Sequence, residues 1–166
     1  MEFALIKVKV TPKDPTMKTN AAILVVDDEE VVRRSFQRVL ASERCRVEAV
    51  GDGEQAIRAM EARAFDIVLL DLRMPGMDGM AVLRTMKGRW PEGEVIVITG
   101  YPSVDTAKEA IRLGAWGYLA KPLAPREVIE AANGAMEHKH WTLRREAGGR
   151  ANESNGGAFA TPGNAG

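Results

Sequence analysis

The sequence lacks several features that would decide its class at once. It has one cysteine, so no disulfide can form within the chain, which fits a reducing cytoplasmic location. It has no run of about 18 apolar residues, the length that a membrane-spanning helix requires. Its first ten residues lack the unbroken apolar core and the cleavage site of a secretory signal. We therefore expect a cytoplasmic protein with no membrane segment.

The chain also lacks net charge and has few aromatic residues. Lys plus Arg and Asp plus Glu both number 23, so bulk charge gives no indication of nucleic acid as a partner. Aromatic residues make up 5% of the 166 residues, but hydrophobic residues as a whole reach 45%, which is enough for a core. A chain of this length is typical of one domain with tails.

The two ends differ from the middle of the chain. Residues 1–20 include "TPKDPTMKTN", whose prolines and polar residues predict a flexible N-terminal extension, with Met17 as an alternative start of the native chain. Residues 146–166 are rich in glycine, alanine and asparagine, which predicts a disordered tail. The folded domain is therefore expected over residues 21–145. Cys45 lies within it, either as a small, partly buried apolar residue or as a reactive thiol.

Short apolar runs alternate with helical stripes along the expected domain. The expected strands are 22–26, 47–50, 66–71, 95–99 and 116–120, and the expected helices are 29–40, 54–63, 80–87, 104–113 and 125 to about 143. Runs of this kind are typical of strands that are buried on both faces. Alternation of strands and helices implies right-handed crossovers and a parallel sheet covered on both sides. The sequence therefore predicts an α/β fold.

Polar side chains stand where the expected strands end. Asp27 and Asp28 follow the first strand, and the later ends carry Asp71, Thr99 and Lys121. Ligands of open parallel sheets bind beyond the carboxyl ends of the strands. We therefore expect three carboxylates, a hydroxyl and an ammonium group to lie together at one rim of the sheet.

Carboxylates this close repel one another, by roughly 4 kcal/mol per pair at 4 Å and an effective dielectric near 20. A hard divalent cation relieves the repulsion, and a site with few carboxylates and open water positions favours Mg²⁺. One carboxylate can then attack phosphorus, and Asp71 is the candidate because it stands alone at its strand end. Lys121 would neutralise the phosphoryl oxygens, and Thr99 would donate a hydrogen bond to one of them.

Four segments carry a family resemblance, and they occur in the family's order and at its intervals. These segments, "VVDDEE", "DIVLLDLRMPGMDG", "VIVITGY" and "GAWGYLAKP", resemble the successive motifs of a response-regulator receiver domain over roughly residues 21–140. The resemblance implies a flavodoxin-like (βα)5 fold of the chemotaxis-receiver type, with strand order 2-1-3-4-5. It also implies two-component signal transduction, with phosphorylation of Asp71 by a sensor histidine kinase or a His-containing phosphotransfer protein. Such a receiver is no conventional enzyme, but it catalyses its own phosphorylation and dephosphorylation.

The resemblance also assigns roles around Mg²⁺. The acidic pair Asp27 and Asp28 matches the pair that serves the metal in the family. By position, Asp28 would ligate it directly, together with Asp71 and the backbone carbonyl of Arg73.

The resemblance further implies a switch. Thr99 and Lys121 match the hydroxyl and the lysine that sense the phosphoryl group, and Tyr118 matches the switch aromatic. Phosphorylation would reshape the surface of the fourth helix, fifth strand and fifth helix. The Lys121–Pro122 bond would be cis. Arg73 and Tyr101 stand at the two positions that tune hydrolysis of the phosphoryl group, and both are bulky enough to shield it from water.

Several residues have plainer interpretations. Asp78 in "MDG" favours a turn over a metal ligand. His138 and His140 are two residues apart on a helix and point in different directions, which disfavours a metal site. Trp141 and Leu143 lie past the usual end of the fifth helix in the family, where they would cap the domain or form a dimer seam.

Other functions stay open on the sequence alone. The main alternative is a degenerate receiver that binds partners without phosphorylation, although all five key residues are present. A small phosphatase usually has a second acid two residues after its nucleophile, where Arg73 stands. A flavodoxin-like cofactor binder would need a phosphate-cradling loop, but "DDEE" repels phosphate.

The stretch after Arg145 is too short for a DNA-binding or ATPase domain, so we expect a stand-alone receiver or a fragment of a longer regulator. Its expected partners are the kinase or phosphotransfer protein, a downstream target protein and a second copy in a phosphorylation-linked homodimer. No direct contact with nucleic acid is expected within this chain.

Overall fold

The computed structural model describes residues 17–153, along which five strands and five helices alternate. The strands are β1 (Ala21–Val26), β2 (Cys45–Val50), β3 (Ile67–Asp71), β4 (Glu94–Thr99) and β5 (Gly117–Ala120). The helices are α1 (Glu30–Leu40), α2 (Gly53–Ala62), α3 (Gly79–Arg89), α4 (Val104–Arg112) and α5 (Pro125–Glu153). Each element occurs where the sequence predicts it, and only the C-terminal end of α5 differs substantially.

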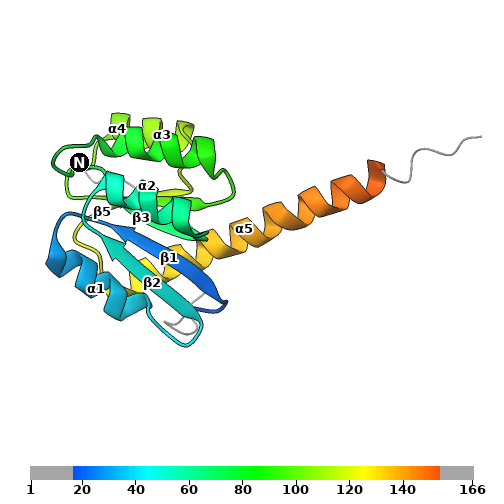
Figure 1. Ribbon diagram of the computed structural model, residues 1–166, viewed down its shortest axis with the longest axis horizontal. Coiled ribbons are helices and arrows are strands. Elements are labelled where there is room, and N and C mark those ends of the chain that lie inside the picture. The colour runs from blue at the N-terminus through cyan, green and yellow to red at the C-terminus, as the bar shows by residue number, and fades with distance from the viewer. Residues whose placement is uncertain (1–16, 154–166) are drawn as a thin grey trace, which may run out of the picture.

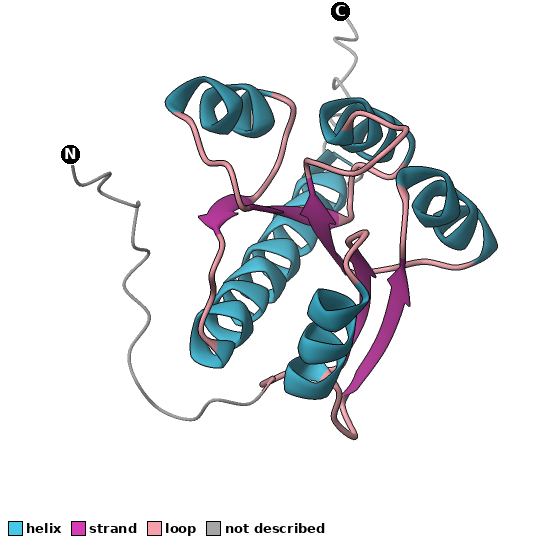
Figure 2. Ribbon diagram, turned by 90° about the vertical axis from the view of Figure 1, so that its left-hand side faces the viewer, coloured by secondary structure: helices cyan, strands magenta, loops and turns pink. Residues whose placement is uncertain are grey.

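The strands form one parallel sheet in the order β2-β1-β3-β4-β5. This order confirms the predicted α/β fold. Helices cover both faces of the sheet, as Figure 2 shows. The central strands β1, β3 and β4 are therefore buried almost throughout, which explains why their sequences are continuous apolar runs.

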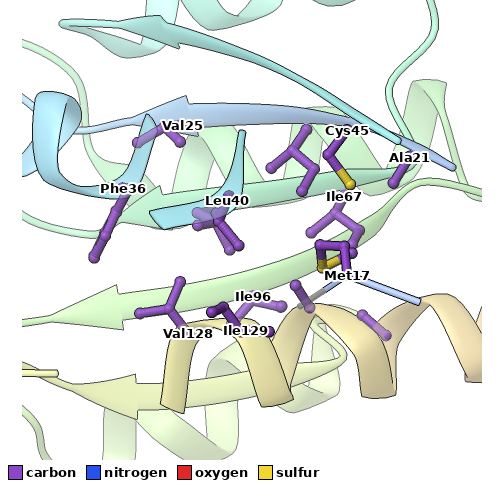
Figure 3. Packing of buried hydrophobic residues seen from close by; sticks show 14 of the residues in the cluster. Met17, Ala21, Val25, Phe36, Leu40, Cys45, Ile67, Ile96, Val128 and Ile129 are labelled. Carbon is purple, nitrogen blue, oxygen red and sulfur yellow. The ribbon is translucent and has the colours of Figure 1, made fainter. Parts of the chain in front are cut away.

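The core has two halves, one on each face of the sheet. The half formed with α1 and α5 contains Val25, and the half formed with α2, α3 and α4 contains Leu24, because successive strand residues point to opposite faces. Figure 3 shows the first half, in which Leu40 of α1 and Ile129 of α5 pack against the sheet. The sheet is therefore a rigid support for the loops at its carboxyl edge.

Short polar side chains fix the starts of two helices next to those loops. Asp78 caps α3 by accepting a hydrogen bond from the N–H of Met80, and Ser103 caps α4 by accepting one from the N–H of Thr106. Asp78 thus has a local role in the turn, as the sequence favours.

The N-terminal boundary of the folded body lies earlier than predicted. Met17 was expected in the flexible extension, but it is 5% exposed and belongs to the core half of α1 and α5. The N–H of Lys18 donates a hydrogen bond of 3.0 Å to Oδ1 of Asn133, which holds this segment against α5. Residues 1–16 lie outside the described residues, so the extension stays a prediction there.

The C-terminal boundary also differs. Helix α5 continues through residues 146–153, which the sequence assigned to a disordered tail, and Figure 1 shows it projecting beyond the body of the domain. Its two glycines disfavour a helix, but extending a helix that has already been nucleated costs less than starting one, and its alanine, arginine and glutamate residues are good helix formers. Residues 154–166 lie outside the described residues.

Two consecutive residues of α5 anchor this helix to the starts of two strands. Nδ1 of His138 lies 2.8 Å from Oε1 of the buried Glu94, and Nζ of Lys139 lies 2.7 Å from Oδ1 of Asp66. His138 therefore has a structural partner. Within the described part of the chain, no helix combines the length and the apolar character needed to span a bilayer.

Candidate functional site

Three carboxylates meet at the carboxyl edge of the sheet. Asp27 and Asp28 follow β1, Asp71 ends β3, and these two strands are neighbours. Oxygen atoms of the three side chains all lie within 4.8 Å of one another. Asp27 and Asp71 are buried, whereas Asp28 is exposed. Among the residues that the structure describes, this is the only such group of three potential metal ligands.

The ammonium group of Lys121 joins this cluster from the end of β5. Its Nζ lies 2.6 Å from Oδ2 of Asp27 and 3.2 Å from Oδ2 of Asp71. The Lys121–Pro122 peptide bond is cis, as the resemblance implies. The expected convergence of Asp27, Asp28, Asp71 and Lys121 is therefore present, and Lys121 bridges two of the three carboxylates.

Burial and charge act against each other at this cluster. Burial raises the pKa of Asp71, and the charge of Asp27 adds to the rise, although the N–H of Arg73 and the ammonium of Lys121 oppose it. Burial alone would lower the pKa of Lys121, but the hydrogen bond and charge of Asp27, joined by Asp71, outweigh burial and raise it. The lysine is therefore held firmly in its charged form beside the carboxylates.

The hydrogen bonds leave room for a cation. Oδ1 of Asp27 accepts from the N–H of Glu29, and Oδ1 of Asp71 accepts from the N–H of Arg73. Within the described residues, the carboxylate of Asp28 accepts no hydrogen bond, so its oxygens are available to a ligand. A set of carboxylate oxygens, one of them exposed, fits Mg²⁺. The carbonyl of Arg73 lies in the same loop, two residues after Asp71.

Thr99 ends β4, between the strands that carry Asp71 and Lys121. It is 1% exposed, and its Oγ1 accepts a hydrogen bond of 3.1 Å from the N–H of Tyr101. Its carbonyl accepts a bond of 2.8 Å from the N–H of Lys121. The hydroxyl proton of Thr99 is not used in these contacts, so it can be donated to a new acceptor.

Tyr118 is held at the start of α4. Its hydroxyl lies 2.6 Å from Oγ1 of Thr106 and accepts a longer bond, 3.3 Å, from the N–H of Ser103. The ring is half-buried against the core half of α2, α3 and α4. The sequence gives no sign of the contact with Thr106, because the two residues meet only when α4 packs beside β5.

The two predicted tuning residues contact each other. The guanidinium carbon of Arg73 lies 4.3 Å from the centre of the Tyr101 ring, in a cation–π contact. Tyr101 is 67% exposed, and each residue is tied by its N–H to a residue of the site, Arg73 to Asp71 and Tyr101 to Thr99. The stacked pair therefore bridges the two loops that follow β3 and β4.

Comparison with protein families agrees with this geometry. The model of the response regulator receiver domain matches residues 23–133, most of the chain. This chain belongs to the response-regulator receiver family. It is therefore a phosphoryl-accepting type of domain from two-component regulators.

Curated relatives of the receiver are transcriptional regulators that are much longer. The alginate biosynthesis transcriptional regulatory protein AlgB of Pseudomonas aeruginosa is 34% identical over 134 residues, which are 81% of this chain and 30% of that protein. The transcriptional regulatory protein ZraR of Escherichia coli is 39% identical over 73% of this chain and 27% of its own length. The receiver thus spans between a quarter and a third of these relatives.

Solved structures of other receiver-containing proteins are similar to this chain. NtrX from Brucella abortus matches with a TM-score of 0.71 and 35% identity, over 78% of this chain and 30% of NtrX. A CheY-like receiver domain from Methanospirillum hungatei matches with a TM-score of 0.72 and 26% identity, over 75% of this chain and 99% of the other.

One residue beside the acidic cluster was missed by the sequence. Nη1 of Arg33 in α1 donates hydrogen bonds to the main-chain carbonyls of Asp27, at 2.8 Å, and Asp28, at 3.0 Å. An arginine on an amphipathic helix is usually assigned to the solvated face, and only the path of the β1–α1 loop brings these carbonyls within its reach.

Proposed function

We propose that this receiver accepts a phosphoryl group on Asp71 from a sensor histidine kinase or a His-containing phosphotransfer protein. Asp27, Asp28 and Asp71, with the carbonyl of Arg73, would hold Mg²⁺. The observation that carries the proposal is the placement of Asp71 beside Lys121, at 3.2 Å, within an acidic cluster at the strand ends. No other described group combines a buried carboxylate nucleophile, an ammonium partner and oxygen ligands.

The transfer is a nucleophilic displacement at phosphorus. A carboxylate oxygen of Asp71 bonds to phosphorus, the phosphorus–nitrogen bond of the donor phosphohistidine breaks, and its electron pair stays on the imidazole nitrogen. The product is an acyl phosphate on Asp71. Lys121 then has a phosphoryl oxygen as an acceptor, and Thr99 can donate its hydroxyl proton to another. When bound, Mg²⁺ supplies positive charge that offsets the charge of the phosphoryl oxygens.

The same residues provide a switch. A phosphoryl group adds a charge of about −1.5 to −2 and strong acceptors, which draw Thr99 away from the N–H of Tyr101. Tyr118 can then leave Thr106 and turn towards the vacated space, which releases the start of α4 from β5. The surface of α4, β5 and α5 changes shape as a result and acts on a downstream target.

The partners follow from this chemistry. A phosphohistidine protein supplies the phosphoryl group, and the switched surface is read by a target protein, by a further domain of a longer regulator or by a second copy of the chain. The relatives AlgB and ZraR are named as transcriptional regulators, and they extend far beyond the matched region. A role in transcription is therefore the first output to test for a longer protein that contains this receiver.

The direct test uses a small phosphoryl donor. We expect the wild-type chain to gain one phosphoryl group from acetyl phosphate in the presence of Mg²⁺, and none in excess EDTA, as measured by intact mass. Beryllofluoride with Mg²⁺ should shift the amide NMR signals of Thr99, Thr106 and Tyr118, because these residues carry the proposed switch. Signals of α2, which carries none of the proposed switch residues, serve as the internal reference.

Two outcomes would contradict the proposal. Absence of the phosphoryl adduct, together with an unchanged spectrum in beryllofluoride and Mg²⁺, would favour the degenerate receiver that binds partners without phosphorylation. If the adduct formed equally well in EDTA, phosphorylation would not require Mg²⁺, and that part of the proposal would be wrong.

The stacked pair of Arg73 and Tyr101 should slow hydrolysis of the acyl phosphate. Hydrolysis requires water to attack phosphorus in line, and the stacked pair bridges the loops that follow Asp71 and Thr99. We expect the double variant Arg73→Ala with Tyr101→Ala to lose its phosphoryl group roughly tenfold faster, which corresponds to about 1.4 kcal/mol of barrier. The half-life is measured by intact mass after removal of acetyl phosphate.

A matched control is available elsewhere on the surface. Arg89 stacks on Trp90 at 4.5 Å, in the same kind of contact but at the end of α3. Arg89→Ala should leave the half-life unchanged, and Tyr101→Phe should retain most of the protection because the ring is kept. Equal half-lives for the wild type and the double alanine variant would contradict shielding.

A further inference from the structure

We infer that Arg33 is a positioning residue for the loop of Asp27 and Asp28, and that it sets the affinity of the acidic cluster for a divalent cation. The inference rests on the proposed function, since it assumes that the cluster binds Mg²⁺. It adds a residue from α1 to a site whose other members lie at the ends of strands or in the loops after them.

The contacts of Arg33 are unusual for an arginine beside three carboxylates. A guanidinium group normally binds carboxylates in a bidentate fork. Here Nη1 instead donates to the two main-chain carbonyls, Asp27 O at 2.8 Å and Asp28 O at 3.0 Å. Arg33 therefore fixes the path of the loop without occupying the carboxylate oxygens that a cation needs.

The surroundings of Arg33 hold it in this place. It lies in the first turn of α1, with its N–H bonded to the carbonyl of Glu29, so its side chain folds back over the start of its own helix. A Cβ atom on Gly51 would lie 3.5 Å from Nη1 of Arg33, which places the guanidinium between the β1–α1 and β2–α2 loops. The side chain thus reaches from α1 to both loops.

The arrangement divides two tasks between two cations. Lys121 neutralises side-chain oxygens of Asp27 and Asp71, whereas Arg33 adds positive charge next to Asp28 and leaves its exposed carboxylate unbonded. Residues that hydrogen-bond to metal-binding residues, and orient them without touching the metal, typically contribute 10- to 100-fold to metal affinity. Loss of Arg33 should therefore weaken cation binding and leave the chemistry of Asp71 intact once the cation is bound.

The test compares two adjacent arginines. Arg33→Met keeps the apolar stem but removes the charge and the donors. Arg34→Met is the control, because Arg34 is exposed and, among the residues that the structure describes, pairs only with Glu30, at 2.6 Å. Calorimetric titration with Mg²⁺ should give a dissociation constant at least tenfold higher for Arg33→Met and within twofold of the wild type for Arg34→Met. In phosphorylation by acetyl phosphate, the Mg²⁺ concentration at half-maximal rate should rise, and the maximal rate should stay within twofold.

Salt separates positioning from simple charge. At about 1 M KCl the Debye length is near 3 Å, so a long-range charge effect would be screened, whereas the loss caused by two missing hydrogen bonds should persist. A Mg²⁺ affinity of Arg33→Met equal to that of the wild type would overturn the inference. A defect that disappears in high salt would do the same.

A measurement without metal keeps the inference separate from the proposed function. In metal-free protein, Arg33→Met should speed hydrogen exchange at the amide of Glu29, which bonds to Oδ1 of Asp27, and leave the β3 amides unchanged. Unchanged exchange at Glu29 would count against Arg33 even if the variant folds well. A wild type that binds no Mg²⁺ would instead contradict the proposed function, and the exchange result would still decide the role of Arg33 in the loop.

Discussion

Asp71→Asn should abolish phosphoryl uptake, whereas the same replacement seven residues later, Asp78→Asn, should leave uptake close to the wild-type level. The amide of asparagine has no negative oxygen to attack phosphorus, but it still accepts the hydrogen bond from the N–H of Arg73. At position 78 the side chain caps α3, and asparagine caps helices as well as aspartate does. Intact mass after incubation with acetyl phosphate and Mg²⁺ measures both.

Asp71→Asn should also stabilise the metal-free protein. Burial and the charge of Asp27 raise the pKa of Asp71 in the folded state, so the folded protein resists ionisation that the unfolded chain, with a pKa near 3.9, accepts freely. Asp71 therefore contributes its full stability below about pH 4, and that contribution is lost as the pH rises through the raised folded value. At pH 7 we expect the variant to gain on the order of 1 kcal/mol of unfolding free energy.

Denaturant titration at pH 7 and near pH 3 measures this difference. The gain should shrink towards zero at the lower pH, where the wild-type carboxyl is protonated in both states. Saturating Mg²⁺ should stabilise the wild type more than the variant, because the cation binds the folded cluster. If the Asp71→Asn variant gained a phosphoryl group, or if the Asp78→Asn variant failed to gain one, the acceptor would have been assigned wrongly.

Gly79→Ala should destabilise the fold by about 3 kcal/mol, at the upper end of the usual cost of overpacking. Gly79 begins α3, and an added Cβ would lie 2.4 Å from the Cα and 2.6 Å from the carbonyl oxygen of Leu72. These are main-chain atoms of the residue after Asp71, so relief requires a shift of the loop that holds the phosphoryl acceptor. Phosphorylation should therefore slow along with the loss of stability.

Gly88 near the other end of the same helix provides the control. A Cβ at Gly88 would meet nothing within 4 Å, so Gly88→Ala should gain up to about 1 kcal/mol from the better helix propensity of alanine. Urea denaturation measures both variants, and acetyl phosphate measures their uptake. A Gly79→Ala variant within about 0.5 kcal/mol of the wild type would show that the close approach of α3 to Leu72 is unnecessary.

The two predictions concern the same physical requirement. The site concentrates carboxylates at the edge of a sheet, which is unfavourable for stability unless cations are held nearby. Lys121 is a permanent cation, and the proposed Mg²⁺ is an exchangeable one, so the stability of the domain and its readiness for phosphoryl transfer depend on the same charges. The loop between Asp71 and Gly79 must be tightly placed, because it supplies both the acceptor and the carbonyl of Arg73.

The fold and the main members of the site could be predicted from the sequence. Continuous apolar runs such as 95–99 indicate strands buried on both faces, and each run ends in a polar residue at the edge where a parallel sheet binds ligands. These are properties of local pattern and of topology, which do not depend on the details of packing. They suffice to predict that Asp27, Asp28, Asp71 and Lys121 lie together.

The ends of the folded domain were harder to predict from the sequence. The sequence around Met17 is polar apart from the methionine itself, and a single apolar residue gives no periodic pattern, yet its side chain fills the core beside α5. The helix beyond Leu143 carries two glycines, which disfavour helix in isolation, and it continues because α5 is already anchored through Lys139 and Asp66.

By itself, the sequence determined which residues are available at the rim and what chemistry their side chains support, because residue type and strand position are local properties. Only the tertiary structure decided which atoms meet. It placed Lys121 nearer to Asp27 than to Asp71, stacked Arg73 on Tyr101, and turned Arg33 towards main-chain carbonyls. Such contacts depend on the paths of loops and on the reach of long side chains between elements. Neither can be predicted from the order of residue types along the chain.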